Sequence, residues 1–193
     1  LFIALRGWIR LFLHNLFDDK KEIPVKGADP GMADRFKKWE IGGVVWVVAA
    51  GGLLHFAYGL LGHSPVVGLL APVNESVWEH LKLLLLPTLL LGLAESWAFP
   101  SLGGRLWWAR AQGLLAGMLV IVDLFYLYSG VWGRSLLVVD IALFCLGAGT
   151  SGWVCCRKAK APPQKWDGVL GALVFLALFF AFGLFTFFPP SIG

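Results

Sequence analysis

Six acidic and imidazole side chains lie within or beside long apolar stretches of this sequence, where ionisable groups are costly to place. They are His55, Glu75, Glu79, His80, Asp123 and Asp140. Histidine and carboxylate groups serve as general acids and bases, and together they bind zinc, iron or manganese. The sequence therefore predicts one polar site built from these six residues. The two histidines and two aspartates, His55, His80, Asp123 and Asp140, are the predicted ligands of a divalent transition metal.

Three kinds of function fit such a site. The first is a membrane-embedded hydrolase or transferase that acts on a lipid or lipid-linked substrate at the extracytoplasmic face. In that enzyme the histidines act as bases or metal ligands, the aspartates orient or ligate, and the glutamates complete the shell. The second is a small proton- or cation-coupled transporter, although the sequence lacks the inverted repeats of many transporters. The third is a non-catalytic subunit of a larger membrane complex, in which Lys82 neutralises Glu79 or Asp140.

The elements that must position these groups are membrane helices. Of the 193 residues, 58% are hydrophobic and only 15% are charged, against ~25% in a soluble domain. The mean hydropathy of +0.75 agrees, and a soluble globular protein is excluded. The net charge of +4 comes from bases that flank apolar stretches, so it indicates membrane topology rather than nucleic-acid binding. The three cysteines lack metal or redox spacing, which excludes a disulfide scaffold and a zinc finger.

Five apolar stretches are long enough to cross ~30 Å of hydrocarbon at ~1.5 Å per residue. They cover residues 41–61, 77–99, 106–129, 132–155 and 167–188. The predicted fold is thus an all-α polytopic bundle of five transmembrane helices. Counting along each helix puts both histidines and both aspartates at one depth, so we expect them to converge. Residues 62–72 are too short to cross and are predicted to dip into the bilayer surface.

Local signals refine the second stretch. Ser76 and Glu79 have the spacing of a capping box, which predicts a helix beginning at Val77. Pro87 lies in the middle of that stretch, where a kink is expected. Glu95, near its other end, is expected to pair with Arg105 or Arg110.

The N-terminal segment carries a different pattern. From Leu1 to Phe17, Arg6, Arg10 and His14 recur every four residues in an otherwise apolar run, which predicts an amphipathic helix lying in the membrane interface. This helix could also dock onto a membrane protein partner. Residues 1–40 therefore form an interfacial helix with a basic linker, and residues 41–193 form the five-span domain.

The basic residues predict the orientation. Of 16 lysines and arginines, eight precede the first span, two follow the second and four follow the fourth. Only Lys82 and Arg134 lie toward the opposite side of the membrane. Because basic residues accumulate on the cytoplasmic side, the N-terminus is predicted to be cytoplasmic in a cell inner membrane.

Residues 72–82 read PVNESVWEHLK. Together with His55-Phe56, residues 128–130 (YSG), Asp140-Ile141 and residues 185–190 (FTFFPP), this string resembles a family of bacterial multi-pass membrane proteins of unknown function. The resemblance covers residues 41–190. It implies a membrane protein, and it implies no activity, substrate or cofactor.

Overall fold

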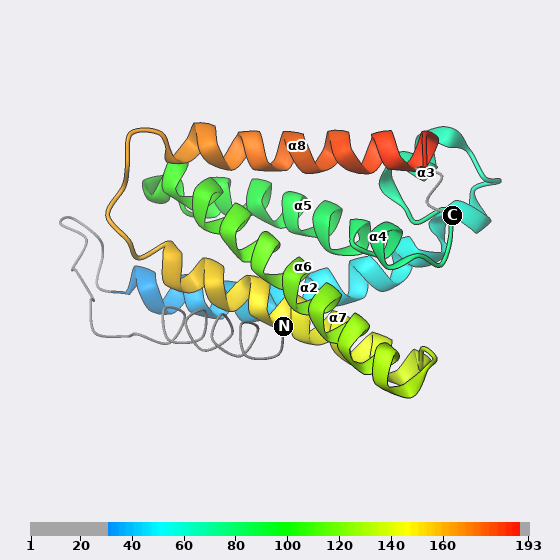
Figure 1. Ribbon diagram of the computed structural model, residues 1–193. Coiled ribbons are helices and arrows are strands. Elements are labelled where there is room, and N and C mark those ends of the chain that lie inside the picture. The colour runs from blue at the N-terminus through cyan, green and yellow to red at the C-terminus, as the bar shows by residue number, and fades with distance from the viewer. Residues whose placement is uncertain (1–30, 190–193) are drawn as a thin grey trace.

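A computed structural model describes residues 31–189 of the chain as a bundle of long helices (Figure 1). The helices are α2 (Met32–Leu60), α3 (Pro65–Leu70), α4 (Val77–His80), α5 (Lys82–Ala98), the 3-10 turn η1 (Pro100–Leu102), α6 (Gly104–Trp132), α7 (Leu137–Lys158) and α8 (Asp167–Phe187). Five segments in this part of the chain are long and apolar enough to cross a membrane, with α4 and α5 counting as one. The predicted all-α, five-span fold is confirmed. The predicted interfacial helix at residues 1–17 lies outside the described residues.

Two helices do not begin where their apolar stretches begin. Helix α2 begins at Met32, ahead of the apolar stretch that starts at residue 41, so the charged residues just before that stretch are part of the helix. Helix α7 begins at Leu137 rather than at residue 132, because Trp132 completes α6. Gly133, at φ 72°, ends α6 in the left-handed conformation that glycine adopts at little cost.

The span formed by α4 and α5 begins as predicted. The Ser76 hydroxyl accepts a hydrogen bond from the Glu79 backbone N–H at 3.2 Å, which caps α4. Leu81 joins the two helices with helical backbone angles, φ −64° and ψ −21°. Pro87 lies inside α5 without ending it, and its carbonyl accepts a hydrogen bond from Trp46 Nε1 on α2 at 3.1 Å.

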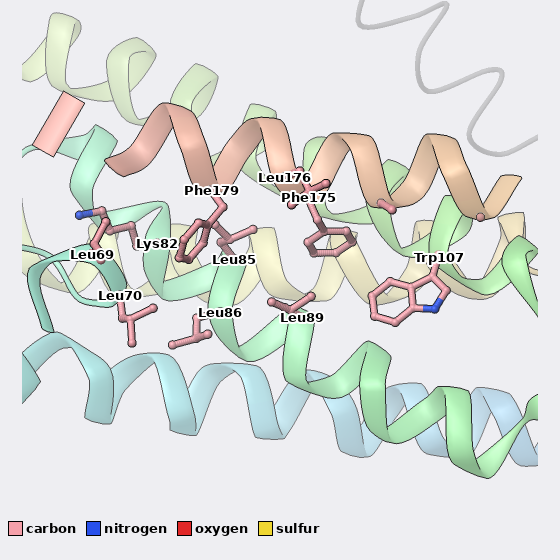
Figure 2. Close-up of a pocket in the computed structure, with 12 residues that line it drawn as sticks. Leu69, Leu70, Lys82, Leu85, Leu86, Leu89, Trp107, Phe175, Leu176 and Phe179 are labelled. Atoms are coloured by element: carbon pink, nitrogen blue, oxygen red, sulfur yellow. The ribbon is translucent and has the colours of Figure 1, made fainter. Parts of the chain in front are cut away.

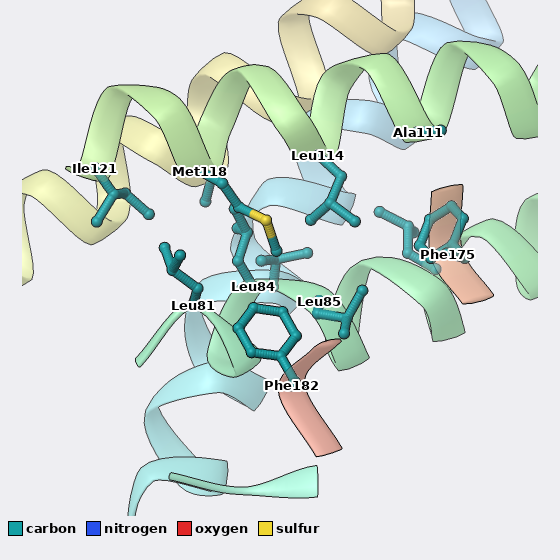
Figure 3. Packing of buried hydrophobic residues seen from close by; sticks show 12 residues of the cluster. Leu81, Leu84, Leu85, Ala111, Leu114, Met118, Ile121, Phe175 and Phe182 are labelled. Atoms are coloured by element: carbon teal, nitrogen blue, oxygen red, sulfur yellow. The ribbon is translucent and has the colours of Figure 1, made fainter. Parts of the chain in front are cut away.

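Successive long helices run in opposite directions, so most of the helix ends lie at one of two ends of the bundle (Figure 1). We call one group the basic end: there α2 begins, α5 passes into α6, and α7 ends. At this end Phe36 packs edge-on against Phe99, with ring centroids 5.2 Å apart. The α4 end is where α2 ends and α4 begins. Between these ends, Leu84, Leu114 and Phe182 pack α5, α6 and α8 together in an apolar core (Figure 3).

Helices α6 and α7 make a particularly close pair through glycines. A Cβ atom added to Gly113 would lie 2.3 Å from the backbone oxygen of Ser151, and one added to Gly117 would lie 2.5 Å from that of Gly147. Lipid tails are as apolar as leucine, so helix association in a membrane depends on such close packing more than on hydrophobic burial. The glycines therefore join α6 and α7 into one hairpin.

A buried ion-pair triad joins three helices near the basic end. Arg110 on α6 donates from Nη2 to Glu40 Oε1 at 2.7 Å and from Nη1 to Glu40 Oε2 at 3.2 Å. Arg110 Nη2 also donates to Glu95 on α5, which confirms the expected pairing of Glu95. The other expected partner, Arg105, instead donates to the Ala161 carbonyl at 2.7 Å. All three triad residues are buried, so each charge depends on the others for compensation.

Candidate functional site

His55, Glu75 and His80 meet at the α4 end of the bundle. His55 lies near the end of α2, Glu75 lies in the loop before α4, and His80 ends α4. One ligand atom from each residue can be chosen so that all three lie within 4.8 Å of one another. The rings of His55 and His80 have centroids 5.1 Å apart. We call these three residues the His-Glu cluster.

The hydrogen bonds of His80 determine which ring nitrogen faces the cluster. Its Nδ1 lies 2.8 Å from the Ser76 carbonyl oxygen. A carbonyl only accepts hydrogen bonds, so Nδ1 carries the proton and Nε2 has a free lone pair in the neutral ring. His80 Nε2 lies 3.4 Å from Glu75 Oε2. The atom of His80 that faces Glu75 is thus the one able to bind a metal.

The loop that carries Glu75 is held by short-range hydrogen bonds. The Asn74 side-chain oxygen accepts from the Ser76 N–H at 3.0 Å, and Glu79 Oε2 accepts from the Val73 N–H at 3.1 Å. The Glu75 side chain itself is 86% exposed, whereas that of His80 is 29% exposed. The backbone of the loop is thereby fixed, while the Glu75 side chain is left uncovered by the rest of the protein.

Glu79 belongs to a different network, centred on Lys82. The Lys82 ammonium donates to Glu79 Oε2, to the Gly68 carbonyl of α3 and to the Thr186 hydroxyl of α8, each at 2.7 Å. Glu79 and Lys82 are both buried. Lys82 thus neutralises Glu79, as the non-catalytic alternative expects, and all three ammonium protons have acceptors. This Lys82 network joins α3, α4, α5 and α8 directly beside His80.

The two aspartates are not brought to the His-Glu cluster. Asp140 accepts a hydrogen bond from the Tyr128 hydroxyl, which itself accepts from the Leu136 N–H at 3.1 Å. Asp123 is exposed on α6. In Figure 1 the far half of the α6–α7 hairpin leans away from α2, α5 and α8. The glycine contacts between α6 and α7 keep these two helices together, so both aspartates follow the hairpin rather than the bundle.

The sequence reasoning missed Glu40 as a partner of Arg110. Glu40 was counted with the linker before the first span, yet it lies inside α2. The signal was its spacing from the small and apolar residues Gly43, Val47 and Gly51, which are buried on one face of that helix. A carboxylate on the buried face of a helix predicts a cationic partner in the interior of the bundle.

Comparison with known proteins gives one match. Residues 31–193 match the model of a family described as a family of unknown function, DUF6512. No curated protein and no solved structure matches the chain. The family match covers every residue of the site.

Proposed function

The chain belongs to the DUF6512 family of unknown function, and we propose that it is a membrane-embedded, metal-dependent hydrolase of lipids or lipid-linked substrates. The observation that carries this proposal is the His-Glu cluster, with His80 Nε2 turned toward Glu75 by the hydrogen bond at Nδ1. The metal is a divalent transition ion, with zinc favoured by the ligand set.

The cluster has the composition of a catalytic metal site. His55, His80 and Glu75 would hold a zinc ion through two imidazoles and one carboxylate, and three protein ligands are the number found in catalytic zinc sites. Ligand atoms ~2.1 Å from such an ion lie about 3.4 Å apart. The distance between His80 Nε2 and Glu75 Oε2 is already 3.4 Å. The Ser76 carbonyl supplies the outer hydrogen bond that orients a metal-bound histidine.

This arrangement supports hydrolysis. A zinc ion held by His55, His80 and Glu75 would activate water for attack near neutral pH. The Glu75 side chain is exposed, so a carbonyl or phosphoryl group of a substrate could approach the cluster from that side.

The surroundings of the cluster favour a lipid substrate. Leu53, Phe56 and Leu60 surround His55 in the sequence of α2 and are 75%, 63% and 81% exposed. These apolar side chains would contact acyl chains in a bilayer, so a lipid headgroup in that leaflet could reach the cluster from the side. With the basic end in the cytoplasm, this leaflet is the extracytoplasmic one.

The interior of the bundle favours an enzyme over a transporter. Leu81 and Leu84, which follow His80 in the chain, are 5% and 0% exposed and belong to the apolar core of the bundle. A cation leaving the cluster toward the basic end would have to cross this packed core. The cluster therefore serves one face of the membrane.

The test is the metal content of the full chain purified in detergent without chelators. We expect about one equivalent of zinc, iron or manganese by elemental analysis, and its loss in His55→Ala, His80→Ala and Glu75→Gln variants. His63→Asn is the matched control, because His63 is also at the α4 end and asparagine tolerates its left-handed backbone, φ 58°. Wild-type protein that binds no metal, even after zinc is added, would overturn the proposal.

Two further measurements sharpen that test. Asp123→Asn and Asp140→Asn should retain the metal, because neither aspartate lies in the His-Glu cluster. Hydrolysis of a panel of phospholipids and lipid-linked diphosphates should disappear on chelation and return with zinc. Hydrolysis that is unaffected by chelation would contradict a metal-dependent reaction.

A further inference from the structure

A groove of about 860 Å³ lies between α2 and α5 near the basic end of the bundle. Its lining from α2 includes Arg35, Lys38, Trp39, Gly42 and Trp46, at the spacing of one helix face. Its lining from α5 is small or apolar and includes Ala94 and Ala98. The groove therefore has a charged part, an aromatic part and an apolar part.

The charged part is positive. Within residues 31–189, neither Arg35 nor Lys38 forms an ion pair with a carboxylate, and the Arg35 guanidinium lies 5.9 Å from the centre of the Phe99 ring. Two carboxylates of the described residues are close in sequence. Asp34 is exposed in the first turn of α2, and Glu40 is buried with Arg110. The bases at the groove thus remain available for an anion.

The groove as a whole has about the length of one leaflet. Arg35 and Trp46 are separated along α2 by about 16 Å, at ~1.5 Å per residue, and half of a ~30 Å hydrocarbon core is about 15 Å. The apolar part, from Lys38 to Trp46, accounts for ~12 Å of that length. Gly42 and Ala94 leave the groove hollow, since a Cβ atom on Gly42 would meet nothing within 4 Å. Trp39 and Trp46 are 41% and 46% exposed and form its aromatic wall. The Pro87 carbonyl holds the Trp46 ring in place.

We infer that this groove binds an anionic phospholipid, with the phosphate at Arg35 and Lys38 and an acyl chain along Gly42 and Ala94. Basic pockets between membrane helices bind anionic headgroups, and the ~12 Å of apolar groove below Lys38 can hold the first part of one acyl chain. Residues 1–17 of the same chain are the competing occupant. That segment contains Arg6 and Arg10 and no acidic residue, so its charge repels the bases of the groove.

A second groove lacks the available positive charge of the first. It has a volume of about 610 Å³, and residues such as Leu85, Leu89, Phe175 and Phe179 of α5 and α8 line it (Figure 2). Its charged residue is Lys82, whose ammonium donates to three protein acceptors. This groove offers an apolar surface without an available charge, so it gives no preference for an anionic headgroup.

Native mass spectrometry of the full chain in detergent tests the inference. We expect wild-type protein to retain phosphatidylglycerol in preference to phosphatidylcholine. Arg35→Gln should weaken phosphatidylglycerol binding about fivefold, and the double variant with Lys38→Gln about 25-fold, without a matching change for phosphatidylcholine. Lys158→Gln is the charge control, because Lys158 is exposed at the same end but does not line the groove. Equal retention of the two lipids by wild-type protein would overturn the inference.

Shape is tested separately from charge. Gly42→Leu should fill the groove and reduce binding of both lipids, whereas Gly52→Leu should not, because Gly52 also has open space around it but lies outside the groove. A photoactivatable residue replacing Leu90, in the same groove, should capture phospholipid when the protein is illuminated in membranes. Capture of the chain's own residues 1–17 in its place would refute the lipid assignment. The metal content should be the same in all of these groove variants. A failure of the lipid inference can therefore be distinguished from a failure of the proposed hydrolase.

Discussion

Replacing Arg110 with leucine should strongly destabilise the bundle, because two carboxylates on neighbouring helices depend on its guanidinium. Arg110, Glu40 and Glu95 are 1%, 4% and 0% exposed, and the arginine bonds both acids. Breaking a buried ion pair by removing one partner costs about 3–5 kcal/mol. Two acids lose their cation here, so we expect the upper end, about 5 kcal/mol. For a chain of this length, that loss lowers the melting temperature by roughly 10–20 °C.

The assay is thermal unfolding of the purified variants in detergent. Arg134→Leu is the matched control, since Arg134 is exposed in the turn between α6 and α7 and its loss should shift the midpoint by at most a few degrees. A triple variant with leucine at all three triad positions removes the desolvation cost along with the attraction. It should recover to about the wild-type midpoint or above it.

Two results would refute this reasoning. The Arg110→Leu variant could have the same melting temperature as the Arg134→Leu variant, which would mean that the two carboxylates do not rely on the guanidinium. The triple variant could also melt as low as the single variant, which would show that packing around the long side chains, rather than charge compensation, determines the loss.

Three further outcomes are expected. Lys82→Met leaves the buried Glu79 carboxylate without its cation, so it should lower the melting temperature. It should also weaken zinc binding about 10–100-fold, because Glu79 helps to hold the loop that carries Glu75. Gly113→Ala should cost about 1–3 kcal/mol, because its Cβ would lie 2.3 Å from a carbonyl oxygen of α7, while Gly149→Ala, with nothing within 4 Å, should be neutral or stabilising. In a variant without native cysteines, Ser64→Cys should react with an impermeant thiol reagent added outside cells and Lys160→Cys should not; the reverse pattern would invert the proposed orientation.

The sequence by itself determined the number and the approximate position of the membrane helices. Bilayer thickness fixes how many apolar residues a crossing needs, so the five candidate spans follow from run lengths alone. Short-range signals were equally informative, because their partners lie one turn away. The Ser76 cap of α4 is one example, and the Glu79–Lys82 pair at i and i+3 is another.

Tertiary structure decided which ionisable groups meet. Counting residues gave each group a depth along its helix, and that single coordinate placed His55, His80, Asp123 and Asp140 in one layer. It could not give the direction of a side chain around its helix or the tilt of the helix itself. His55 and His80 meet because the α2 and α4 ends pack together, whereas the aspartates follow the α6–α7 hairpin away from them.

The same reason explains Glu40 and Glu75. Glu40 reaches Arg110 from a helix 70 residues away in the sequence, and Glu75 reaches His80 because hydrogen bonds of the preceding loop fix its backbone. Helix tilt and rotation depend on where glycines let two backbones approach each other. Each such contact involves residues of two helices, so it cannot be found by considering one helix alone. The sequence of one helix therefore specifies its length and its depth in the membrane, whereas the packing of helices against one another specifies the site.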